Sequence, residues 1–155
     1  MLAGMIPITR VLSAEHQMFR ALFDQIEELL PRLERLEEVK RLARLVEGLL
    51  LSHAKVEADL FMLAQDPAGR SEHYYDRCCH EHQEIDSQVI RLQSARNIAG
   101  ARRLFRGAMA ASRRHFQLEE RKAFPRLEKE VKPEALAKLG TVWFLQRHAP
   151  RHWTL

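Results

Sequence analysis

The chain has 155 residues, a formal net charge of +4 at pH 7, and only 6 glycines and 6 prolines. This length suits one domain with its own hydrophobic core, and the scarcity of glycine and proline favours long helices over a β-rich fold. No apolar run approaches the roughly 20 residues that span a bilayer, and the N-terminus lacks a signal-peptide pattern, so we expect a single all-α domain over residues 1–155 in the cytoplasm.

Apolar side chains recur at alternating steps of four and three residues, the period of a helix that packs in a bundle. The first helix is expected over residues 8–30, with Thr9 as a candidate N-cap and Pro31 closing it. The second is expected over residues 36–64. Its inner stripe is expected to hold Leu42, Leu45 or Val46, Leu49, His53, Val56 or Glu57, and Leu60.

The third helix is expected to begin near Ser71, a plausible N-cap, and to turn Tyr75, Cys78, His82, Ile85, Val89 and Leu92 inward. Residues 97–100 (Asn-Ile-Ala-Gly) predict a break. The fourth helix is expected over residues 101–124, where Pro125 kinks or ends it. A short fifth helix is expected over residues 133–146.

Short connections between these helices predict an antiparallel up-down-up-down four-helix bundle with a short C-terminal fifth helix. The bundle core is expected over about residues 8–130.

Each of the four long helices carries one histidine on its apolar stripe, and two of these histidines open a His-x-x-x-Glu spacing. Residues at i and i+4 are neighbours on a helix, so each pair places an imidazole beside a carboxylate. Polar groups turned into an apolar core cost roughly 1–3 kcal/mol or more each unless something satisfies them. The sequence therefore predicts a shared metal site formed by His16, His53, Glu57, His82, His115 and Glu119.

The number of ligands favours two metals over one. Four histidines and two glutamates exceed what a tetrahedral zinc ion needs, whereas two metals bridged by the carboxylates and by solvent would use all six groups and leave open positions. His16 precedes His53 by 37 residues and His82 precedes His115 by 33, which indicates two half-sites. Imidazole with carboxylate suits iron, manganese, zinc or copper.

Other interpretations of the six groups remain open at this point. A single core histidine is often satisfied by a backbone carbonyl or a tyrosine, and Glu57 and Glu119 could face outward beside the seam. Glu120 is the rival of Glu119, but at i+5 from His115 it is expected to face away. If the six groups do not bind metal, a helical interaction module becomes the alternative function.

The bundle plan and the order of these motifs resemble the hemerythrin-like, or HHE cation-binding, domains. The resemblance spans about residues 8–130 and rests on four fragments: Leu12-Ser-Ala-Glu-His16, His53-Ala-Lys-Val-Glu57, Glu81-His82, and His115-Phe-Gln-Leu-Glu119 followed by Phe124-Pro125. It implies a non-haem di-iron centre, oxo- or hydroxo-bridged, held by the six predicted ligands. Other divalent metals such as zinc or manganese also fit such a site.

One departure from the family pattern concerns Cys78. Oxygen-carrying hemerythrins have a fifth histidine one turn before the third-helix ligand, and here that position holds Cys78. The resemblance is therefore to the four-histidine branch, in which one iron has an open position. We expect a protein that senses, stores or responds to oxygen, nitric oxide or peroxide. The alternatives are an enzyme acting on peroxide or nitric oxide, and an iron donor for cluster repair.

The histidines, arginines and aromatic residues outside the predicted metal site bear on other possible partners. His73 and His80 lie on the polar face of the third helix, and His148 and His152 lie in the tail. We interpret the arginine cluster of the fourth helix as a solvated face, so that neither nucleic acid nor a membrane is an expected partner: Arg102, Arg103, Arg106, Arg113 and Arg114. The aromatic residues of the C-terminal region favour either a homodimer or a cap on the bundle: Trp143, Phe144 and Trp153.

Overall fold

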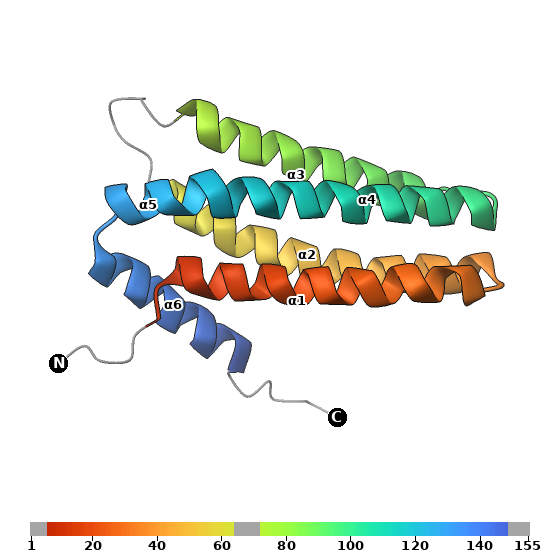
Figure 1. Cartoon of the computed structure of the whole chain (residues 1–155), viewed down its shortest axis with the longest axis horizontal. Helices are drawn as coiled ribbons and strands as arrows, with labels where there is room; N and C mark the ends of the chain where they lie inside the picture. The colour runs from red at the N-terminus through yellow and green to blue at the C-terminus, as the bar shows by residue number, and fades with distance from the viewer. Residues whose placement is uncertain (1–5, 64–71, 149–155) are drawn as a thin grey trace.

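The computed structural model describes residues 6–63 and 72–148, and the side chains of residues 6–60 and 80–145. Within these ranges the chain is helical and contains no strand. The four long helices are α1 (Ile8–Leu29), α2 (Leu36–Leu63), α3 (Glu72–Gln93) and α4 (Ile98–Leu118). They lie side by side and alternate in direction along the long axis of the molecule (Figure 1). The predicted all-α, up-down-up-down bundle is confirmed.

The C-terminal end of α4 departs from a regular α-helix. A five-residue π-helical turn (η2, Glu119–Ala123) follows α4 and leads into α5 (Phe124–Glu130), in which Pro125 occupies the first turn. The backbone N–H of Phe124 donates to the carbonyl of Glu119, five residues earlier. Pro125 has no N–H and cannot continue the α-helical ladder, and the wider turn brings the chain past it. The expected kink is therefore a π-turn, which is common at functional sites.

The last helix, α6 (Pro133–His148), packs obliquely against the beginning of α1 (Figure 1). The two segments approach closely at Gly140, where a Cβ atom would lie 1.9 Å from the carbonyl oxygen of Ile6. Trp143 is half-buried against the core at this end, and Phe144 is exposed. Trp153 lies outside the described residues. The homodimer remains a prediction.

The core consists of two apolar clusters with a polar layer between them. The cluster toward the α1–α2 turn contains Phe19, Phe23, Ile26, Val39, Phe105 and Phe116. The cluster toward α6 contains Ile8, Leu12, Leu60, Phe124, Leu127 and Leu136. On α1 the polar layer begins at His16, one turn beyond Leu12 and one turn before Phe19, and the buried polar side chains of the other helices lie at the same level.

The inner stripe of α2 differs from the prediction. Leu45 and Leu49 are exposed, at 68% and 43%. Leucines occur at two phases on this helix, so apolar periodicity alone does not select one face. The phase that faces inward is the one that also brings His53 and Glu57 to the buried polar groups of the other helices. It holds Val39, Ala43, Val46, His53, Glu57 and Leu60.

Two predicted helix signals are wrong in detail. Thr9 does not cap α1; the N-cap position is Pro7, and the buried Thr9 hydroxyl donates to Glu128 Oε1 at 2.6 Å. Residues 97–100 are not a break, because α4 already begins at Ile98. The side chain of Asn97 accepts from the backbone N–H of Gly100 at 2.7 Å. This N-cap satisfies a donor of the first turn, so the glycine is tolerated inside the helix.

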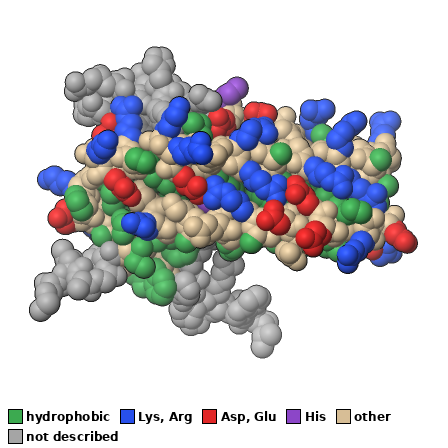
Figure 2. All heavy atoms as spheres, viewed as in Figure 1, with side chains coloured by type: hydrophobic (Ala, Val, Ile, Leu, Met, Phe, Trp, Pro, Cys, Tyr) green, Lys and Arg blue, Asp and Glu red, His purple; other side chains and the backbone are tan. Residues whose placement is uncertain are grey.

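The face shown in Figure 2 mixes basic and acidic side chains along the bundle. Two of the clustered arginines of α4 connect helices: Arg102 donates to the carbonyls of Pro31 and Leu33, and Arg113 binds Asp24 and Glu27 of α1. No described helix has both the length and the apolar character needed to cross a membrane.

Candidate metal centre

The polar layer brings together all six residues that the sequence predicted as ligands. His16 comes from α1, His53 and Glu57 from α2, His82 from α3, His115 from α4, and Glu119 from the first residue of η2. Five of them are at most 1% exposed, whereas the His82 side chain is 23% exposed. Buried groups of this kind need partners, and they face one another across the bundle axis.

The six residues form two overlapping groups that share both carboxylates. One group contains His16, His53, Glu57 and Glu119, and the other contains His82 and His115 with the same two glutamates. Within each group, one candidate donor atom per residue lies within 4.8 Å of every other. Two pairs of imidazoles thus share two carboxylates. This arrangement is expected when the carboxylates bridge two metal ions.

Some donor atoms of the cluster contact one another, as His16 Nε2 and His53 Nε2 do at 3.0 Å, but others are left without a hydrogen-bond partner in the described part of the chain. His82 Nε2 lies 3.1 Å from Glu57 Oε2, and His115 Nε2 lies 3.3 Å from Glu119 Oε1. Nevertheless Glu57 Oε2, His115 Nε2 and both Glu119 oxygens have no hydrogen-bond partner among the described residues. Buried polar atoms without partners are rare in native structures and call for an explanation. A metal ion between them would supply the missing partner, so these residues fit a metal site.

Three of the histidines are oriented by carboxylates outside the set of six. The Nδ1–H groups donate at 2.9 Å to Glu120 Oε1 from His16, to Glu15 Oε2 from His53, and to Glu81 Oε2 from His115. A donated Nδ1 proton leaves the Nε2 lone pair free to bind a metal, and fixes the ring orientation. All three Nε2 atoms point to the interior.

Sequence reasoning missed Glu15, Glu81 and Glu120 as functional residues. A signal was present for two of them, because Glu15 directly precedes His16 and Glu81 directly precedes His82. Each accepts a hydrogen bond from the histidine of the following helix. Glu120 was expected to face away. The π-turn changes the direction of residues after Glu119 and brings Glu120 to His16, so that expectation is wrong.

Two aromatic rings stack against His16. Phe116 stacks against it with ring centroids 4.2 Å apart, and Phe124 stacks with centroids 5.6 Å apart. Phe116 also lies edge-on to His53, with centroids at 5.6 Å. The rings exclude water on this side and restrict the imidazole to one orientation, which reduces the entropy that ligand ordering would cost.

Without metal, the charges of the cluster strongly perturb one another. Burial disfavours charge on His53 and His115, but the neighbouring carboxylates outweigh burial and raise the pKa of His53 to about 10 and that of His115 to about 11. Burial lowers the pKa of His16. Burial together with the negative charge of Glu57 raises the pKa of Glu119 to about 8. Although burial opposes it, the charge of His53 holds the pKa of Glu57 well below its ordinary value.

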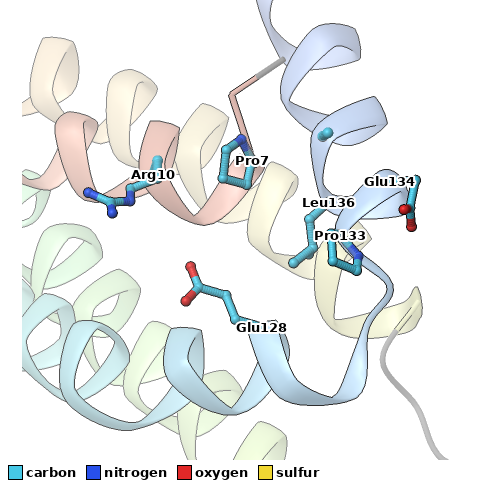
Figure 3. A pocket seen from close by; sticks show the side chains of 7 residues that line it. Pro7, Arg10, Glu128, Pro133, Glu134 and Leu136 are labelled. Carbon is cyan, nitrogen blue, oxygen red and sulfur yellow. The ribbon is translucent and has the colours of Figure 1, made fainter. Parts of the chain in front are cut away.

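A narrow crevice between α2 and α3 reaches the cluster from the surface. It is lined by Leu50, Leu51, Ala54, Ile85, Asp86, Phe116 and three of the histidines, His53, His82 and His115. Of the three histidines, His82 has the most exposed side chain, at 23%. A separate surface hollow lies between the beginning of α1, α5 and α6, where Pro7, Arg10, Glu128, Pro133, Glu134 and Leu136 line it without any histidine (Figure 3). We assign no chemistry to that hollow.

Several residues discussed from the sequence do not join the centre or cannot be placed. His80 is exposed, as expected for a solvated histidine. The side chains of His73, Tyr75, Cys78 and His148 lie outside those described, as does all of His152.

Comparison with known proteins gives one family match. The model of the hemerythrin HHE cation binding domain matches residues 8–139, which include all six clustered residues and the three orienting glutamates. No curated protein and no solved structure matches the chain. The family match and the His/Glu cluster agree on metal binding.

Proposed function

The chain belongs to the hemerythrin HHE cation-binding domain family, and we propose that it is a non-haem di-iron protein that senses, stores or responds to oxygen, nitric oxide or peroxide. The proposal is carried by one observation: two groups of candidate ligands share the buried Glu57 and Glu119, and each group has two imidazoles of its own. The proposed ligands are His16, His53, Glu57, His82, His115 and Glu119.

The composition of the donor set favours reversible binding over oxygen activation. Carboxylate-bridged centres of the ferritin type use more glutamate than histidine, whereas here imidazoles outnumber carboxylates by four to two. Neutral imidazoles place less negative charge on the metals, which favours their reduced state. Iron held by these imidazoles and carboxylates would supply redox chemistry toward a small diatomic molecule or peroxide.

The protein surrounding the cluster supports access for a small ligand only. Phe116 and Phe124 cover His16 and exclude water there. The crevice between α2 and α3 reaches His82 and is lined by apolar side chains such as Leu51 and Ile85, with Asp86 near its mouth. A diatomic molecule or peroxide fits such a route, whereas a bulky organic substrate does not. Zinc or manganese would suit the same donors, so the identity of the metal as iron is part of the proposal.

An enzyme acting on peroxide or nitric oxide is distinguished from a binding protein by turnover. The reduced, iron-loaded protein is titrated anaerobically with nitric oxide, and separately with peroxide, while absorption and consumption are followed. A binding protein changes its spectrum until its sites are full and then consumes no more ligand. Continued consumption of excess peroxide or nitric oxide would replace the sensing or storage function with an enzymatic one. Transfer of iron to an apo iron–sulfur protein would support the third alternative, iron donation.

A further inference from the structure

The two halves of the centre are related in sequence by a repeated plan. Glu15-His16 on α1 pairs with His53 and Glu57 on α2, and Glu81-His82 on α3 pairs with His115 on α4 and Glu119 at the start of η2. The orienting contacts repeat as well. Glu15 accepts from His53 at 2.9 Å, and Glu81 accepts from His115 at 2.9 Å. Up to this point the halves are equivalent.

The equivalence ends at the residue that follows each shared glutamate. Glu120 follows Glu119 and accepts from Nδ1 of His16 at 2.9 Å. The corresponding residue after Glu57 is Ala58, whose side chain cannot accept a hydrogen bond. Among the described residues, a π-turn that brings the following residue toward the neighbouring helix occurs after α4, and α2 remains α-helical through Ala58. The histidine equivalent to His16 in the other half is His82.

Arg20 fixes Glu120 in place. Both carboxylate oxygens of Glu120 accept from the guanidinium, at 2.9 Å from Nη1 to Oε1 and 2.9 Å from Nη2 to Oε2. A bidentate contact of this kind restricts the carboxylate in position and in plane. The contacts from Arg20 to Glu120 to His16 therefore connect the surface to a proposed ligand. Phe116 and Phe124 also stack against the His16 ring.

The half that is held more rigidly, with His16 and His53, is also the more deeply buried half. His16, His53 and His115 are at most 1% exposed, whereas the His82 side chain is 23% exposed. His53, His82 and His115 line the crevice, and His82 is the most exposed of the three. A ligand that is rigidly held and dry loses little freedom on binding metal, and water cannot easily replace it. A partly exposed ligand permits water to compete for the metal.

We infer that Glu120, held by Arg20, is a positioning residue that makes the His16–His53 half of the centre the first to bind metal and the last to release it. The His82–His115 half is then the exchangeable one, and metal enters and leaves it through the crevice between α2 and α3. This inference rests on the proposed metal centre. It predicts a protein that can hold one metal at low supply and two at high supply.

The test is a titration of metal-free protein with Co²⁺, followed by the visible absorption of the bound ion and by metal analysis after gel filtration. The wild-type protein is expected to bind two Co²⁺ in two steps, the first at least about 10-fold tighter than the second. Glu120→Gln is expected to weaken the first step by about 10-fold to 100-fold, the usual effect of losing such an orienting group, and to leave the second step little changed.

Glu27→Gln is the matched control. Glu27 accepts two contacts from Arg113 across the same α1–α4 boundary, at 2.8 Å and 3.3 Å, but no histidine contact to it is found among the described residues. The Glu27→Gln variant should bind Co²⁺ in both steps as the wild-type protein does. His82→Ala should retain one tightly bound Co²⁺, which assigns the tight step to the other half.

The outcomes separate the inference from the function on which it rests. Two equal binding steps in the wild-type protein, or a Glu120→Gln variant that loses only the weaker step, would overturn the inference and leave the proposed metal centre intact. A wild-type protein that binds no Co²⁺ would overturn both. Circular dichroism of each variant verifies that the bundle is folded before its binding steps are compared.

Discussion

Glu15 Oε2 lies 2.9 Å from Nδ1 of His53, which belongs to the next helix, although Glu15 is the immediate neighbour of His16 in the chain. Glu81 stands in the same relation to His115, at the same distance. Each orienting glutamate therefore connects two helices of a hairpin as well as fixing a ring. This repeated contact ties the packing of the bundle to the geometry of the centre.

Replacing either of these glutamates should weaken metal binding without unfolding the bundle. Glu15→Gln and Glu81→Gln keep the side-chain volume but exchange a charged acceptor for a neutral one, so we expect about 10-fold to 100-fold lower affinity in each. Competition with a chromophoric chelator measures the change. Glu28→Gln, on the exposed face of α1, is the control. Affinity equal to that of the wild type in both variants would mean that these contacts do not act on the metal.

Glu119→Gln should have opposite effects with and without metal. Burial and the charge of Glu57 raise the pKa of Glu119 to about 8, which means that its negative form is unfavourable in the metal-free protein. A neutral side chain of the same shape should leave the metal-free protein as stable, or more stable by about 1 kcal/mol. The stabilisation on adding metal should shrink, because a shared ligand is lost. Thermal unfolding of both forms tests this, and an equal loss of stability in the two forms would argue against a metal role for Glu119.

Metal binding should release protons and weaken as the pH falls. The pKa of His53 is raised to about 10 and that of His115 to about 11, so both rings are protonated at neutral pH without metal. Each must lose its Nε2 proton to bind an ion. Lower pH therefore favours the metal-free form. Calorimetric titration of Zn²⁺ in buffers of different ionisation enthalpy counts the protons, and we expect more than one released per chain at pH 7. A count near zero would contradict this charge assignment.

A substitution at Gly140 tests the packing of α6 separately from the centre, and one at Gly48 of α2 serves as its comparison. A Cβ at Gly140 would lie 1.9 Å from the backbone oxygen of Ile6, so Gly140→Ala should destabilise the protein by about 1–3 kcal/mol. Gly48 of α2 has nothing within 4 Å of such a Cβ, and Gly48→Ala should stabilise by about 0.5–1 kcal/mol. Urea unfolding compares the pair. A neutral Gly140→Ala would mean that α6 does not hold the N-terminal segment closely.

The sequence predicted the bundle and the set of clustered side chains because both depend on local spacing. His53 and Glu57 lie one turn apart on a helix, so their proximity follows from the helical period alone. The same holds for His115 and Glu119. Their meeting at one level of the bundle follows once four such helices are antiparallel.

The details that the sequence did not predict depend on tertiary structure. Glu15 and His53 are 38 residues apart, and nothing local indicates that they touch. Leu45 and Val46 were both candidates for one core position, and only the packed bundle selects Val46 as the residue that faces inward. Pro125 indicated an interruption, yet the width of the turn before it, and therefore the direction of Glu120, required the structure.

The most direct test of the central claim is the metal content of protein purified without a histidine tag, together with its absorption spectrum in air and after reduction with dithionite. The account predicts about two irons per chain and near-ultraviolet bands, typical of a bridged di-iron centre, that bleach on reduction. Protein that contains no iron, and takes up none after anaerobic loading with Fe²⁺, would contradict it.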